Sequence, residues 1–142
     1  MAATALTPSV SISKPRAIAV LILAAALATA LNAAVAAIAV VGGVSSGYGP
    51  LTMPAYLSMT VLGIAAGWAG WQLIRRRARN PRRTLGIVVP LVLVASFLPD
   101  VMLAVFRFIP GTTLPAVLAL SVMHVIVAAV AVPAYIVASR PR

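Results

Sequence analysis

The sequence predicts an all-α fold, an integral membrane four-helix bundle with its N-terminus and C-terminus in the cytoplasm. Of the 142 residues, 63% are hydrophobic and only 8% are charged, whereas soluble domains carry about 25% charged residues. Four apolar runs are each long enough to cross a bilayer, which takes about 20 residues. The basic residues gather between or outside these runs, and this placement predicts the orientation.

The four runs use most of the chain, which we interpret as a single transmembrane domain over residues 1–142. Runs of this length without alternation favour helices, because open sheet edges leave backbone groups unsatisfied in lipid. The second run has Pro54 in its first turn, the third closes at Pro110-Gly111, and Thr113 is the expected cap of the fourth. The expected spans are residues 17–41, 52–74, 85–108 and 113–138.

An arginine-rich loop over residues 75–83 is the clearest boundary in the chain. It carries six basic residues, the segments before the first run and after the last carry two each, and the other two connections carry none and only Arg107. Since Lys and Arg accumulate on the cytoplasmic side, the loop and both ends are expected there, in a multi-pass protein of the cell (plasma) membrane. Anionic lipid head groups are the expected contacts of Arg75, Arg76, Arg77, Arg79, Arg82 and Arg83.

The first apolar run has a competing interpretation. Lys14 and Arg16, an apolar stretch and then Ala34-Val35-Ala36 also resemble a signal peptide with its cleavage site. The run continues well past the roughly 7 to 15 residues of a signal core. We therefore expect a retained first helix, while cleavage would leave three spans in the same orientation.

Small residues predict where helices approach closely, because apolar surface gives no association energy between helices in lipid. Gly63, Gly67 and Gly70 form a ridge on the second span, and alanines such as Ala30 and Ala33 line the first. These two spans are the expected tightest pair. Bends are expected at the prolines inside the last two spans, Pro90, Pro99 and Pro133.

The only acidic residue, Asp100, and the only histidine, His124, both fall inside predicted spans. Ionisable groups inside a bilayer cost on the order of 3 kcal/mol on insertion scales, so they face a bundle interior or a cavity. At 1.5 Å per residue both lie about 12 to 15 Å below the outer ends of their helices. Asn32 and Thr60 fall near the same depth, so each span offers one polar group to a common plane.

Three further polar residues lie near this pair along their helices. Ser96 is one turn below Asp100, Ser121 is one turn above His124, and Arg107 is about 10 Å above Asp100 along the axis. The candidate ligand or proton site therefore contains Asp100, His124, Asn32, Thr60, Ser96, Ser121 and Arg107.

Several chemistries do not fit this composition. With no cysteine, one histidine and one carboxylate, neither a metal site nor a cofactor is expected in one chain. A Ser-His-Asp triad has the right residue types in Ser96 or Ser121, but no nucleophile elbow accompanies them. No aromatic residue is interleaved with the arginines, so no nucleic acid partner is expected.

The stretch from Arg75 to Arg83, then Ser96-Phe97-Leu98-Pro99-Asp100, Pro110-Gly111-Thr112-Thr113, Met123-His124 and Ala131-Val132-Pro133-Ala134, resembles a family of small four-helix membrane proteins of actinobacteria. The resemblance covers most of residues 52–138. It implies the four-helix fold and no activity, since none is assigned to that family.

Three hypotheses follow for function. The first is a bundle that binds or passes a ligand or protons at the Asp100 and His124 cluster, open to the outer side, alone or as a homo-oligomer. The second is a membrane-embedded enzyme that uses the pair as acid and base on a lipid or isoprenoid-like substrate. The third is an accessory subunit that holds a membrane protein partner, and the sequence leaves the choice between enzyme and non-enzyme open.

Overall fold

A computed structural model of the chain describes residues 14–140, and this part is helical and contains no strand. The predicted all-α fold is therefore confirmed for the described residues. The N-terminal segment over residues 1–13, and Arg142 in the basic tail, lie outside the described residues.

Four segments of the described chain are long and apolar enough to cross a membrane, as expected of a multi-pass membrane protein. They are built from α1, α2, the pair α3 and α4, and α5, with a short 3-10 turn, η1, before α2. The elements are α1 (Lys14–Val41), η1 (Gly49–Leu51), α2 (Met53–Arg77), α3 (Pro81–Ser96), α4 (Leu98–Phe106) and α5 (Leu114–Ala138).

The arginine-rich segment is mostly helical, although the sequence suggested a loop over residues 75–83. Arg75, Arg76 and Arg77 form the last turn of α2, and Arg82 and Arg83 lie in the first turn of α3. The connection shrinks to residues 78–80 because the Asn80 side chain caps α3, accepting a hydrogen bond from the backbone N–H of Arg83.

The third membrane segment is broken in two, which the prolines only partly predicted. α3 ends at Ser96 and α4 begins at Leu98, so Phe97 lies between them and Pro99 falls in the first turn of α4. Proline has no N–H to donate one turn back and its ring crowds that carbonyl, which explains the break at this point. Pro90 and Pro133, in contrast, lie inside helices that continue past them.

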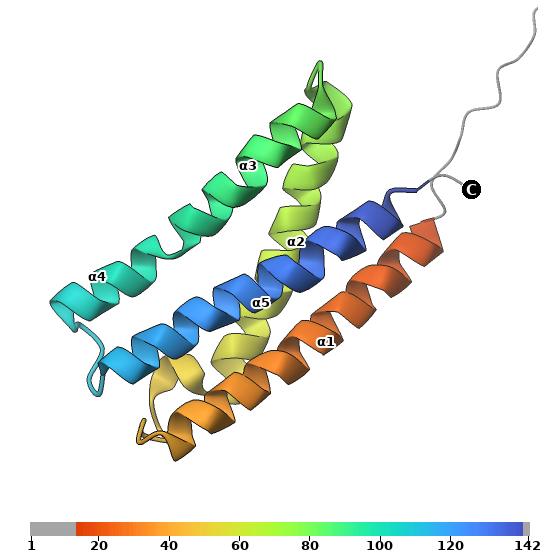
Figure 1. The fold of residues 1–142 in the computed structure, drawn as a ribbon. Helices are drawn as coiled ribbons and strands as arrows, with labels where there is room; N and C mark the ends of the chain where they lie inside the picture. The colour runs from red at the N-terminus through yellow and green to blue at the C-terminus, as the bar shows by residue number, and fades with distance from the viewer. Residues whose placement is uncertain (1–13, 141–142) are drawn as a thin grey trace, which may run out of the picture.

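The tightest pair is α1 with α5, so the expectation of α1 with α2 was wrong. These two helices run side by side along most of their length (Figure 1). α1 buries small side chains, among them Ala24, Ala28, Ala36 and Ala39, which let two backbones approach closely. The glycine ridge of α2 meets α5 instead, since Gly67 lies against the ring of Tyr135.

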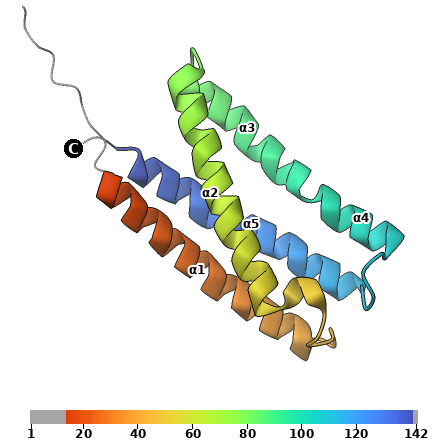
Figure 2. The same ribbon diagram turned by 180° about the vertical axis from the view of Figure 1, so that it is seen from behind.

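The arm made of α3 and α4 packs loosely on the other three helices. α5 lies between this arm and α1, and α2 crosses α5 obliquely (Figure 2). α3 contains no buried residue, whereas α4 buries Asp100 and Leu103 against α5. The arm is therefore held by its ends, at the turn that joins α3 to α2 and at the contact of α4 with α5.

The two loops at the end of the bundle opposite the arginines are tied together. Tyr48 is buried in the first loop, and its hydroxyl lies 3.1 Å from Oγ1 of Thr112 in the loop between α4 and α5. Gly111 has a positive φ of 82° and approaches the same ring, where a glycine is needed for the turn. This contact closes one end of the bundle.

Candidate functional site

Asp100 is the buried centre of the candidate site. It lies in the first turn of α4, directly after the break at Phe97 and Pro99, and its side chain is 7% exposed. The break allows the start of α4 to approach α5 while α3 stands away from it. The position of the carboxylate therefore follows from the proline that interrupts the third segment.

Two side chains of α5 meet this carboxylate. Ser121 Oγ lies 3.1 Å from Asp100 Oδ2 and also 3.1 Å from the backbone oxygen of Val117, so its one proton is shared between these two acceptors. His124 Nδ1 lies 3.3 Å from the same carboxylate oxygen. Residues three apart on a helix share one face, which brings both groups to one point. The structure thus brings together Asp100, His124 and Ser121.

The hydrogen bonds of His124 define which ring nitrogen carries a proton. Nδ1 lies 3.0 Å from the backbone oxygen of Leu120, one turn back on α5. Since a carbonyl oxygen can only accept, and Asp100 Oδ2 lies on the same side, Nδ1 is the N–H donor. In the neutral ring, Nε2 then keeps a free lone pair.

His124 is far more accessible than its partner, with 38% of the side chain exposed. It nevertheless shares an inward stripe of α5 with Val117 and Ala131, seven residues away in each direction, and both of these are buried. The ring is partly uncovered, and Phe97 at the break between α3 and α4 flanks it edge-on with centroids 6.1 Å apart. The ring therefore lies beside the break in the third segment, with part of its surface uncovered.

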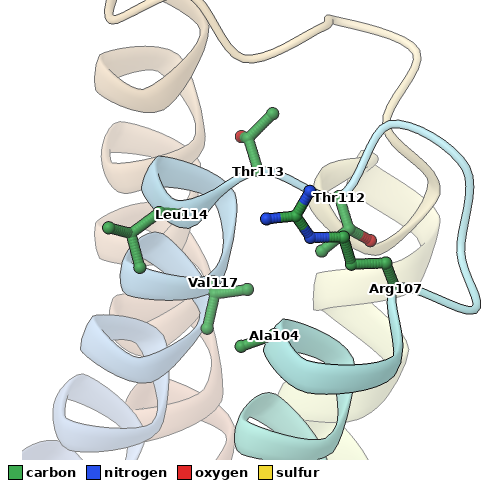
Figure 3. Close-up of a pocket in the computed structure, with 6 residues that line it drawn as sticks. All are labelled: Ala104, Arg107, Thr112, Thr113, Leu114 and Val117. Carbon is green, nitrogen blue, oxygen red and sulfur yellow. The ribbon is translucent and has the colours of Figure 1, made fainter.

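A cavity of about 180 Å³ lies beyond the cluster, at the end that holds the loops. It is lined by Ala104, Arg107, Thr112, Thr113, Leu114 and Val117. Figure 3 shows the Arg107 guanidinium reaching across the gap toward the start of α5. Ala104 is one turn beyond Asp100, and Val117 is one turn before Ser121, so one turn of each helix separates the cavity from the carboxylate.

Asn32 and Thr60 form a separate pair between α1 and α2. Asn32 Nδ2 donates to Thr60 Oγ1 at 2.9 Å, and both side chains are buried. The amide oxygen of Asn32 and the hydroxyl oxygen of Thr29 are buried without a partner within residues 14–140. The polar groups of the four helices therefore form two clusters, one between α1 and α2 and one between α4 and α5, and not the single candidate site expected from the sequence.

Two other expected members do not join Asp100. The Ser96 hydroxyl donates to the backbone oxygen of Leu93 at 2.6 Å, because the helix ends immediately after it. Arg107 ends α4 in a left-handed conformation (φ 49°, ψ 35°) and makes no ion pair with the carboxylate in the described part of the chain. Its backbone turn directs the side chain into the cavity and away from Asp100.

The arrangement supports proton transfer better than nucleophilic or metal chemistry. Ser121 and His124 both contact Asp100, whereas a Ser-His-Asp triad needs the serine hydrogen-bonded to the other ring nitrogen. Among residues 14–140 there is no group of three or more side chains that could hold a metal ion. An imidazole fixed by a carboxylate, with its second nitrogen free, is the geometry of a general base or a proton relay.

The sequence also left several buried contacts unnoticed at the arginine end. Tyr135 Oη donates to the backbone oxygen of Ile64 at 2.7 Å, and its ring lies between Trp68 and Trp71. Ser139 accepts from Trp71 Nε1 at 3.1 Å through its hydroxyl, and from Arg75 Nη1 at 3.2 Å through its backbone oxygen. The glycine ridge of α2 was the sequence signal for these contacts, because glycines leave room for a bulky side chain from a neighbouring helix, here Tyr135.

The chain matches a family model described as Family of unknown function (DUF6069) over residues 12–141, and it therefore belongs to this family. A search of curated proteins finds no match to the chain, and a search of solved structures finds none either.

Proposed function

Since membership in a family of unknown function assigns no activity, we propose one from the geometry: a small membrane protein that binds and passes protons at Asp100 and His124. The observation that carries this proposal is the 3.3 Å contact between His124 Nδ1 and Asp100 Oδ2, on a ring whose other nitrogen has no hydrogen-bond partner among residues 14–140. A polar ligand that donates a hydrogen bond to Nε2 would occupy the same place.

The physical reason is that the cluster can change its charge at low cost. When Nε2 takes a proton, the imidazolium is next to the carboxylate, and the opposite charges compensate each other where the surroundings are apolar. Ser121 stabilises the carboxylate from the other side. If an Asp and a His were buried apart from each other, each would have to stay neutral or carry a charge with no partner, which costs free energy.

The orientation is part of the same proposal. Lys14, Arg75 and Ser139 lie at the same end of the bundle, with Arg75 hydrogen-bonded to Ser139, and the positive-inside rule makes this end cytoplasmic. The resemblance to actinobacterial proteins makes the plasma membrane the proposed location. The cavity with Arg107, one helical turn from Asp100, would then lie on the outer side.

The alternatives have less support from the geometry. An enzyme acting on a lipid needs a substrate-sized apolar pocket beside the acid and base. Neither the cavity at Arg107 nor the groove at Trp71 includes Asp100 or His124 in its lining. An accessory role would rest on a partner protein, and co-purification of a stoichiometric second protein from native membrane would support it.

The test is proton flux into vesicles that enclose a pH-sensitive dye. The wild-type protein is expected to raise flux above that of empty vesicles, and Asp100→Asn and His124→Gln are expected to abolish the increase. Two serine variants form a matched pair. Ser121→Ala removes a donor to Asp100 and should reduce flux. Ser96→Ala removes only a hydrogen bond within its own helix and should leave flux unchanged.

Circular dichroism and gel filtration of each variant show whether it inserts and folds. Wild-type flux equal to that of empty vesicles would refute the proposal. Full flux in both Asp100→Asn and His124→Gln would do the same, because no other acidic residue or histidine exists in the chain to replace them.

A further inference from the structure

An apolar groove runs along α3 at the arginine end of the bundle. It has a volume of about 260 Å³ and is lined by Trp71, Leu85, Gly86, Val89, Pro90 and Val132. These residues come from α2, α3 and α5, so the groove is the space left where α3 stands away from the bundle. Gly86 contributes to its depth, because a Cβ at this position would meet nothing within 4 Å.

Two arginines continue the walls of this groove toward the membrane surface. Arg75 is four residues beyond Trp71 on α2, and Arg82 is four residues before Gly86 on α3, so each lies about one helical turn from a lining residue on nearly the same face. Both are exposed. Arg75 uses Nη1 for the Ser139 carbonyl and has further donors on its guanidinium.

No acidic side chain is available to pair with the arginines at this end. The protein has a single acidic residue, Asp100, and that residue is buried against Ser121 and His124. The six arginines over residues 75–83 therefore have no acidic side chain to pair with. They are therefore open to anions from outside the chain, and phosphate oxygens match the geometry of a guanidinium.

From this charge and this groove we infer a specific site for one anionic phospholipid, with its phosphate at Arg75 and Arg82 and an acyl chain along Trp71 and Gly86. The apolar lining gives no preference over bulk lipid, because lipid tails are as apolar as the groove. The apolar lining fixes the position of the acyl chain, and the arginines select the anionic head group. This inference does not rest on the proposed proton site, which involves neither the groove nor these arginines.

The test is quenching of Trp71 fluorescence by brominated lipids, in vesicles that contain brominated phosphatidylglycerol or brominated phosphatidylcholine. The background variant Trp68→Phe leaves Trp71 as the only tryptophan. Trp71 is expected to be quenched more strongly by the phosphatidylglycerol probe at equal content. Since each basic residue near the surface contributes about 1 kcal/mol, Arg75→Gln or Arg82→Gln should lower this preference by up to about five-fold.

Two matched controls separate the site from general attraction to the surface. Arg76→Gln removes the same charge from a different face of α2 and should lower the preference less than Arg75→Gln. Gly86→Leu fills the groove and should reduce quenching by both probes. Gly70→Leu adds the same side chain to α2, at a position where a Cβ also meets nothing within 4 Å but which does not line the groove. This variant should leave quenching unchanged.

Equal quenching of Trp71 by both probes in the background variant would overturn the inference, because it indicates ordinary bulk lipid. Absence of quenching by either probe, together with a dimer in analytical ultracentrifugation, would overturn it in favour of a second copy of the chain over the groove.

Discussion

The contact between Gly67 and Tyr135 makes a sharp prediction about stability. A Cβ added at Gly67 would overlap Oη of Tyr135 and lie 3.2 Å from Cζ and 3.3 Å from Cε2. The tyrosine cannot simply rotate away, because its ring is buried beside Trp68 and Trp71 and its hydroxyl is held by Ile64. Gly67→Ala therefore forces α2 and α5 apart or breaks this hydrogen bond.

The magnitude follows from three opposing contributions. Overpacking of a close contact costs about 1 to 3 kcal/mol, and loss of the Tyr135 hydrogen bond costs about 1 kcal/mol more. Alanine in place of glycine inside a helix recovers about 1 kcal/mol. We expect Gly67→Ala to lower the free energy of unfolding by about 2 kcal/mol.

Two neighbouring glycines are the controls. A Cβ at Gly63 would lie 3.9 Å from Val127, and one at Gly70 would meet nothing within 4 Å. Gly63→Ala and Gly70→Ala should therefore stabilise the protein by up to about 1 kcal/mol through helix propensity alone. Equilibrium unfolding in mixed micelles, followed by tryptophan fluorescence, measures all three.

A double-mutant cycle with Tyr135→Phe identifies the cause. Tyr135→Phe alone should cost about 1 kcal/mol, whereas in the Gly67→Ala background it removes the overlapping oxygen and should cost nothing or stabilise. If Gly67→Ala proves as stable as Gly63→Ala, the reasoning about this contact is refuted.

Two further predictions concern the other interhelical hydrogen bonds. Thr60→Val leaves the buried Asn32 amide with no partner and should lower the free energy of unfolding by about 1 to 3 kcal/mol. Asn32→Leu removes that unsatisfied amide and should lower the free energy of unfolding less. A larger loss for Asn32→Leu than for Thr60→Val, measured by unfolding in mixed micelles, would contradict this account. Tyr48→Phe should speed amide hydrogen exchange in residues 44–51 and 107–113, at a cost of about 1 kcal/mol. Tyr56→Phe is its control, since the Tyr56 hydroxyl makes no hydrogen bond among residues 14–140; equal exchange in both variants would show that the two loops are not coupled through Thr112.

The helices could be predicted from the sequence because the signals are local. Apolar runs of sufficient length, the Thr113 cap and the prolines in first turns act on the nearest few residues, so the helices appear within a few residues of the expected positions. The pairing of α1 with α5 could not be predicted in this way. Small residues occur on several faces, and the sequence does not show that Tyr135 occupies the glycine ridge of α2.

Of the seven residues expected in the candidate site, the structure brings three together and leaves the other four apart from them. Depth along a helix places Asp100, Ser121 and His124 near one level, and the structure joins them. Depth along a helix does not show toward which neighbouring helix a side chain points. Asn32 and Thr60, which lie at a similar depth, point toward each other and form their own pair. Ser96 was misplaced for a related reason: the break at Phe97 removes it from the face that a continuous helix would have given it.

The pattern of interhelical hydrogen bonds explains why α3 alone stands away from the bundle. Lipid offers apolar helix faces as good a contact as another helix does, so a helix is held either by close approach at small residues, as α1 is against α5, or by polar contacts. α1 and α2 are joined through Asn32, α2 and α5 through Tyr135, and α4 and α5 through Asp100. The side-chain hydrogen bonds of α3 all stay within its own helix or its cap in the described part of the chain. Without a polar partner on another helix, α3 buries no residue, and the groove at Gly86 lies where α3 packs loosely against α2 and α5.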